Sequence, residues 1–126
     1  MGNPVNIALW AVQALLALVY LAAGGLKVVR PREQLVASGN FDWMKDTSDA
    51  GVKAVGAVEL LGALGLILPE LTGIAPILTP IAAVGLVVVQ IGAIRVHLTR
   101  NERQPLPANG ILLLLAAFVA VGRFLG

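Results

Sequence analysis

The sequence predicts an all-α fold: a transmembrane four-helix bundle with antiparallel, up-and-down helices and both termini on the non-cytoplasmic side. Only 13% of the 126 residues are charged and 58% are hydrophobic, whereas a soluble domain carries about 25% charged residues. Three long stretches contain no charged side chain, at residues 1–26, 71–94 and 104–122. A fourth, Gly51–Leu68, is apolar apart from Lys53 and Glu59. Because about 20 apolar residues cross a bilayer core, we expect a single membrane domain over residues 1–126.

The first helix is expected over about residues 7–29, because Pro31 disfavours helical geometry at the residue before it. Its apolar stretch has no basic residue at the start and is too long for a cleavable signal, so we expect it to be retained. The connection that follows begins with PREQLVAS, a segment that suits a short helix. The later part of this connection suits either a headgroup anchor or an ordinary loop, because it carries Phe41, Trp43 and Met44.

The other three helices are expected over about residues 51–68, 76–98 and 108–125. The side chain of Thr47, Ser48 or Asp49 can cap the first of these helices, and Pro69 is expected to end it. Because the connection Glu70–Gly73 is short, we expect the second and third helices to be antiparallel neighbours.

Lys and Arg residues are distributed unequally between the two sides of the predicted bundle. Eight lie beside the first and third connections, namely Lys27, Arg30, Arg32, Lys45, Lys53, Arg95, Arg100 and Arg103. The other side carries only Arg123. Because cytoplasmic loops of membrane proteins are enriched in Lys and Arg, both connections are expected in the cytoplasm. We therefore expect an integral protein of the cytoplasmic (inner) membrane, of bacterial type.

The lack of cysteine excludes thiolate catalysis, iron–sulfur clusters and cysteine zinc sites within the chain. The single histidine excludes a haem held by two histidines, and His97 with Glu59 supplies too few ligands for a metal site. We therefore expect no haem, iron–sulfur or zinc site. Nucleic acid is not an expected partner, because the net charge of +2 is small and the basic residues lie beside helix ends. A redox role would need a bound organic molecule, such as a quinone, or a partner protein.

The few polar residues within the predicted spans share one face of each helix. Seven-residue spacing relates Gln13, Tyr20 and Lys27 in the first helix, and Gln90 and His97 in the third. The fourth helix has a stripe of small and polar residues, formed by Asn109, Ala116, Ala120 and Arg123. At about 100° per residue these sets drift little around the helix. Each stripe is expected to face the bundle interior, because charged and amide groups avoid lipid.

Glu59 is the most informative of these residues, because a carboxylate inside a span costs about 2.5–3.5 kcal/mol on insertion scales. It lies roughly 12 Å into its helix at 1.5 Å per residue. Lys27, His97 and Asn109 lie toward the same side, and we expect them to meet Glu59 in the inner half of the bundle. The further candidates on the same helix faces are Tyr20 and Gln90.

Arg95 competes with His97, because the two lie about 160° apart around their helix and cannot both face its centre. Either Arg95 pairs with Glu59, or His97 faces inward and Arg95 extends to the headgroups; we favour the second, because Gln90 needs the face that His97 uses. The cluster itself has two interpretations. It can pass a proton or hydrogen-bond the carbonyls of a quinone-like ring, or it can fix helix register as a buried ion pair.

These residues carry a resemblance to the DoxX-like family of small four-helix membrane proteins. The matching segments are AAGGLKVVRPREQL, VGAVELLGALGLILPELTG, IGAIRVHLTR and NGILLLLAAFVAVGRF. The resemblance implies kinship with a family that is named for a small subunit of a terminal quinol oxidase. Some of its members are linked to thiosulfate:quinone oxidoreductase, and others resemble the membrane part of an oxidoreductase complex with superoxide dismutase and a sulfurtransferase. The resemblance also implies kinship with distant eukaryotic relatives that act as assembly chaperones for membrane receptors. The family brings no established catalytic residues to carry over.

We expect a redox-associated, quinone-linked membrane subunit whose cluster binds a lipophilic ligand or relays a proton. The alternative is a non-catalytic membrane anchor or assembly chaperone in which the cluster is structural. Small-solute transport is a weaker alternative, because the sequence has no evident inverted repeat or broken helix. The expected partners are the lipid bilayer, a redox enzyme or another membrane protein, and a second copy of the chain. Whether the chain is itself an enzyme stays open.

Overall fold

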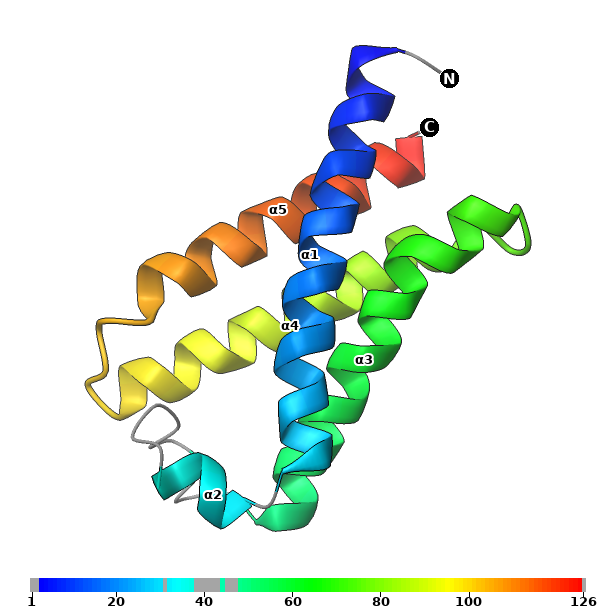
Figure 1. Ribbon diagram of the computed structural model, residues 1–126. Coiled ribbons are helices and arrows are strands. Elements are labelled where there is room, and N and C mark those ends of the chain that lie inside the picture. Colours follow the sequence, from blue (N-terminus) through cyan, green and yellow to red (C-terminus); the bar gives the residue numbers. More distant parts are fainter. Residues whose placement is uncertain (1–2, 31, 38–43, 45–47, 126) are drawn as a thin grey trace.

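The computed structural model describes residues 3–30, 32–37, 44 and 48–125. Within these residues the chain forms five helices and no strand (Figure 1), namely α1 (Pro4–Val29), α2 (Arg32–Ala37), α3 (Asp49–Thr72), α4 (Leu78–Thr99) and α5 (Leu106–Leu125). The four long helices are each apolar and long enough to cross a membrane. The predicted all-α class and the four predicted long apolar helices are therefore confirmed.

Side-chain caps explain where α1 and α3 begin. The Asn3 side chain accepts a hydrogen bond from the backbone N–H of Asn6 at 2.9 Å, and Pro4 occupies a first-turn position where no donor is needed. The helix therefore starts earlier than predicted. The Ser48 hydroxyl accepts a hydrogen bond from the backbone N–H of Gly51 at 3.0 Å, so Ser48 is the cap among the three predicted candidates.

α3 does not end before its proline, as we predicted, but continues through Pro69 to Thr72. Pro69 has no N–H group and cannot donate to the carbonyl of Gly65, four residues earlier. The hydroxyl of Thr79, in the first turn of α4, donates to that carbonyl at 2.8 Å instead. A polar group from the neighbouring helix thus lets α3 continue past the proline, and the helix is capped after Thr72 by Gly73, whose φ of 73° is left-handed.

The long helices associate as two pairs, α1 with α3 and α4 with α5, and the pairs cross each other (Figure 1). We call the half that holds both termini and the α3–α4 connection the terminal half, and the half with α2 and the α4–α5 connection the cavity half. Small residues allow close contact between the pairs toward the terminal half, where Gly62 lies against Leu86, Gly65 against Ala82 and Gly122 against Leu9.

A small core lies where the helix pairs cross, and it includes Leu16, Tyr20, Leu66, Leu86 and Val119. Many large apolar side chains of all four long helices point outward instead, among them Leu18, Leu61, Val88 and Leu114. Monomeric proteins in water rarely expose an apolar surface of this extent. The outward side chains therefore suit contact with lipid.

The connection between α1 and α3 contributes a second, smaller core. Met44 is fully buried and groups with Leu35 of α2 and Val52 of α3. Met44 is therefore a packing residue and not the headgroup anchor that we considered. The other two residues of that predicted anchor, Phe41 and Trp43, lie outside the described residues.

Candidate functional site

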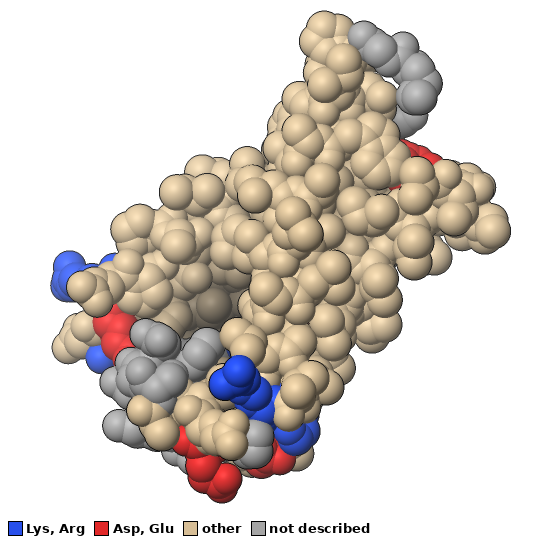
Figure 2. Space-filling model, viewed as in Figure 1, with Lys and Arg blue, Asp and Glu red and all other residues tan. Residues whose placement is uncertain are grey.

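A cavity of about 590 Å³ lies between α1, α3, α4 and α5 in the cavity half, and Figure 2 shows a hollow in this part of the surface. Among the described residues its lining is apolar apart from six side chains, Tyr20, Lys27, Glu59, Gln90, His97 and Asn109. These are the six candidates selected from the sequence. Volumes of about 300–1,000 Å³ are typical of small-molecule sites, so the six residues meet around a space of ligand size.

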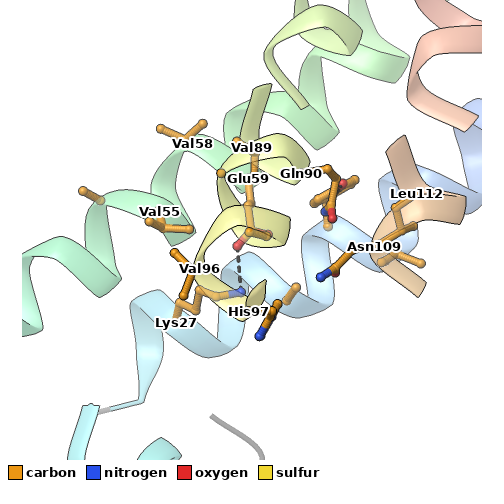
Figure 3. Close-up of a pocket in the computed structure, with 16 residues that line it drawn as sticks. Lys27, Val55, Val58, Glu59, Val89, Gln90, Val96, His97, Asn109 and Leu112 are labelled. Atoms are coloured by element: carbon orange, nitrogen blue, oxygen red, sulfur yellow. Dashed lines mark hydrogen bonds and ion pairs between the residues drawn. The ribbon is translucent and has the colours of Figure 1, made fainter. Parts of the chain in front are cut away.

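Lys27 and Glu59 form a buried ion pair on one wall of the cavity (Figure 3). The Lys27 Nζ lies 2.8 Å from the Glu59 Oε1, and the two side chains are 9% and 6% exposed. Gly24 and Gly56 permit this contact, because a Cβ on Gly24 would lie 2.7 Å from the Gly56 carbonyl oxygen, and one on Gly56 would lie 2.7 Å from the Lys27 Cβ. The absence of both side chains lets α1 and α3 approach closely enough to place the pair.

Tyr20 and Gln90 join the two helix pairs beside the cavity. The Gln90 Nε2 donates a hydrogen bond to the Tyr20 hydroxyl at 2.6 Å, which links α4 to α1. Both side chains are buried. The other amide atom, the Gln90 Oε1, is buried and has no hydrogen-bond partner among the described residues. This side chain therefore has one satisfied and one unsatisfied polar atom.

His97 lines the cavity, but its direct partner is a residue that we did not predict. Its Nδ1 lies 3.0 Å from the Oε1 of Glu102, in the connection between α4 and α5. This hydrogen bond is the largest influence on the pKa of Glu102 and holds it below its usual range. The guanidinium of Arg100 acts in the same direction. Arg95 is exposed, which agrees with the alternative that we favoured. A carboxylate five residues after a helix-end histidine is a signal that could have found Glu102.

Asn109 lies near the start of α5, and in Figure 3 its amide is turned toward the space that faces His97 and the Lys27–Glu59 pair. Its Nδ2 is buried without a hydrogen-bond partner in the described part of the chain. The expectation that Lys27, Glu59, His97 and Asn109 meet therefore needs refinement. The four residues line one cavity, but among them only Lys27 and Glu59 bond directly to each other in the described part of the chain.

A second polar cluster, in the terminal half, was missed by the sequence analysis. The Nε of Arg123 donates to the Gln13 Oε1 at 2.7 Å and lies 3.4 Å from the Glu70 Oε1, and its Nη1 donates to the Asn6 Oδ1 at 3.0 Å. The guanidinium carbon also lies 5.3 Å from the centre of the Trp10 ring. Its Nη2 is buried with no hydrogen-bond partner among the described residues.

The sequence did hold a signal for this second cluster. Gln13 and Arg123 both lie on stripes that were predicted to face inward, and Glu70 is the one acidic residue on the predicted side of Arg123. An isolated cation and an isolated anion at the same depth are expected to pair. The charge distribution alone identifies Arg123 only as a marker of membrane orientation and Glu70 only as a connection residue.

Comparison with known proteins identifies one family. The profile of the DoxX-like family matches residues 11–119 of the chain. No curated protein and no solved structure gives a significant match. All six polar residues of the cavity fall within the matched span, whereas Arg123, Asn6 and Trp10 lie outside it.

Proposed function

The chain belongs to the DoxX-like family, and we propose that it is a redox-associated membrane subunit that binds a quinone or a similar lipophilic ligand in the cavity. The observation that carries this proposal is the lining, in which apolar side chains from four helices surround six polar residues. A neutral ring suits such a lining, because apolar walls bury its faces and a few polar groups fix its orientation.

The charges around the cavity favour a neutral ligand over an anionic one. Lys27 is paired with Glu59, and the ring of His97 lies against the Glu102 carboxylate. An anionic headgroup would therefore meet no uncompensated cation among the described lining residues. Burial of an unpaired charge is costly, and a carbonyl-bearing neutral ring avoids this cost.

We propose further that the cavity half faces the cytoplasm, with antiparallel spans and both termini outside, in a bacterial cytoplasmic (inner) membrane. Eight of the nine Lys and Arg residues flank that side in the sequence. On the face shown in Figure 2, the basic side chains gather at the cavity half. Membrane proteins retain such residues on the cytoplasmic side. In this orientation a lipophilic ligand would reach the cavity from the inner leaflet.

The contact between His97 and Glu102 supports a proton-relay role at the same site. Glu102 lies in the α4–α5 connection, outside the spanning helices, and its carboxylate is 3.0 Å from the ring of a cavity-lining histidine. A neutral imidazole carries a proton on one ring nitrogen and can accept one on the other. A proton taken from cytoplasmic water at this pair could therefore be delivered to a ligand in the cavity.

A second candidate function is a non-catalytic membrane anchor or assembly chaperone, in which the polar cluster sets helix register. The Lys27–Glu59 contact favours this candidate, because the two charges already satisfy each other and join α1 to α3. Buried polar pairs are known to specify register. The exposed apolar faces of the helices would then contact lipid and the partner, a redox enzyme or another membrane protein.

The test is equilibrium binding of ubiquinone-1, a short-chain benzoquinone, to the protein in lipid nanodiscs, with empty nanodiscs as the control for partitioning. The ligand proposal expects saturable binding of about one probe per cavity. Ala93→Phe places a ring in the cavity lining and should abolish this binding. Ala57→Phe, on the exposed face of α3 outside the lining, is the matched control and should leave it unchanged.

Two results would contradict the ligand proposal. Folded wild-type protein that takes up no more probe than empty nanodiscs would favour the anchor or chaperone function. Equal binding by the Ala93→Phe and Ala57→Phe variants would place the probe outside the cavity.

A further inference from the structure

We propose that Gln90 and Asn109, rather than Lys27 and Glu59, hold the polar group of the ligand, an inference that rests on the function proposed above. Both amides line the cavity, and each has a buried atom without a hydrogen-bond partner among the described residues, the Oε1 of Gln90 and the Nδ2 of Asn109. Gln90 is only 4% exposed. Because buried polar atoms are nearly always hydrogen-bonded, the two atoms mark the contacts that a ligand completes.

The ion pair is a poor ligand contact, because its two charges already bond to each other at 2.8 Å. A neutral ligand that replaced this bond would leave a separated ammonium and carboxylate inside the membrane. The close packing of Gly24 against Gly56 also fixes the backbones that carry the pair. Lys27 and Glu59 therefore form one wall of the cavity, and the amides of Gln90 and Asn109 face it from the other side (Figure 3).

The contact between Tyr20 and Gln90 defines the class of ligand more narrowly. As placed, the Gln90 Nε2 donates to the Tyr20 hydroxyl, and the acceptor Oε1 is left for the ligand. Rotation of the amide by half a turn reverses the arrangement: Tyr20 then donates to Oε1, and the donor Nε2 is left for the ligand. The pair can therefore present either an acceptor or a donor without loss of the bond between them.

A 1,4-quinone and its quinol match this behaviour. The quinone carbonyl requires a donor, which the rotated Gln90 supplies, whereas the quinol hydroxyl donates to Oε1. The Nδ2 of Asn109 can donate to a second oxygen of the ring, whether that oxygen belongs to a carbonyl or to a hydroxyl group. The site thus suits a neutral ring with two polar positions, and it accommodates both redox states without any change in the charge of the protein.

The experiment uses ubiquinone-1 with and without carbon-13 at its two carbonyl carbons, bound to the full chain in nanodiscs and observed by isotope-edited infrared spectroscopy. Wild type should show both carbonyl stretching bands below the frequency of the free probe, because each carbonyl accepts a hydrogen bond. Asn109→Leu should return one band to the free frequency and weaken binding about tenfold, the effect of one neutral hydrogen bond.

The other band is tested with the double variant Gln90→Leu, Tyr20→Phe, which leaves no buried hydroxyl unpaired and should release that band alone. Gln104→Leu removes an exposed amide from the α4–α5 connection and is the matched control, with both bands and the affinity unchanged. If Asn109→Leu does not fold, Asn109→Ala removes the same donor with a smaller apolar side chain, and it should lose the same band.

The inference is overturned if the amide variants keep both shifted bands and wild-type affinity, and the double variant Lys27→Met, Glu59→Gln loses them. That outcome would leave the proposed function standing and assign the ligand to the ion pair. Wild-type protein that binds no probe beyond empty nanodiscs would instead reject the proposed function itself.

Discussion

The two halves of the bundle both bury charged residues, but they surround them differently. In the terminal half, the guanidinium of Arg123 bonds to two side chains of α1, Asn6 and Gln13, lies beside Glu70 of α3, and contacts the ring of Trp10. One cation there joins three helices. The guanidinium donors that have partners therefore hold helices together, and the buried Nη2 is left without a partner among the described residues.

In the cavity half, Lys27 and Glu59 bond to each other, and the amides that face them keep atoms without a partner among the described residues, beside a cavity. Both halves meet the cost of a charge in the membrane by pairing it. They differ in the polar atoms left over, which at the cavity lie where a small molecule has room. The comparison teaches that unsatisfied neutral groups, more than buried charge, distinguish a binding site from a structural cluster.

The largest effect should come from breaking the Lys27–Glu59 pair. Lys27→Met or Glu59→Leu alone leaves one buried charge without its partner, and we expect each to lower the free energy of unfolding by about 3–5 kcal/mol. The double variant Lys27→Met, Glu59→Leu should recover most of this loss. Unfolding by titration with SDS, followed by circular dichroism, measures the stability of wild type, of each single variant and of the double variant. Equal stability of the single and double variants would show that another group compensates the remaining charge.

Arg123→Met tests the terminal half in the same way, with a smaller expected effect. It leaves the oxygens of Gln13 and Asn6 and the carboxylate of Glu70 without their cation, and we expect a loss of about 2–3 kcal/mol. The same variant, measured below its unfolding transition, should bind ubiquinone-1 with wild-type affinity. A parallel fall in affinity would mean that the two halves are coupled and that our division between them is too sharp.

Two glycine substitutions test the packing that places the ion pair. Gly56→Ala puts a Cβ 2.7 Å from the Lys27 Cβ and 2.8 Å from the Gly24 carbonyl oxygen, and we expect a loss of about 1–3 kcal/mol from overpacking. A Cβ on Gly85 has no neighbour within 4 Å, so Gly85→Ala should be neutral or stabilise by up to about 1 kcal/mol. Thermal unfolding of wild type and both variants, all in one mild detergent, compares their midpoints. Similar midpoints would show that α1 and α3 can separate at little cost.

Much of this architecture could be predicted, because membrane spans have a strong one-dimensional signal. Uncharged runs of sufficient length located the four long helices, and the seven-residue spacing of Tyr20 with Lys27 and of Gln90 with His97 identified faces that line one cavity. Periodicity reports which face a residue occupies. It does not report which residue on another helix it touches.

The incorrect predictions follow from the fact that periodicity does not report contacts between helices. Pro69 was expected to end its helix because a local rule says so, but the hydroxyl of Thr79 from the next helix satisfies the freed carbonyl. His97 was grouped with Glu59, yet the chain turns at the end of α4 and brings Glu102 to its ring. Each correction depends on a contact between segments, which only the packed structure specifies.

The smallest effect concerns the exposed edge of the cavity half, where the pH dependence of Glu102 can be measured. Because its pKa is lower in the folded protein, its contacts contribute fully to stability above the usual pKa of a carboxyl group, and this contribution is lost as pH falls through the lowered pKa. We therefore expect Glu102→Gln to lower the unfolding midpoint slightly at about pH 7, and the difference from wild type to vanish once the pH has fallen below the lowered pKa of Glu102. Gln104→Leu is the control, since it leaves the carboxylate in place. A difference that persists in acid would mean that the charge of Glu102 does not hold His97, and the proposed proton relay would lose its contact with the α4–α5 connection.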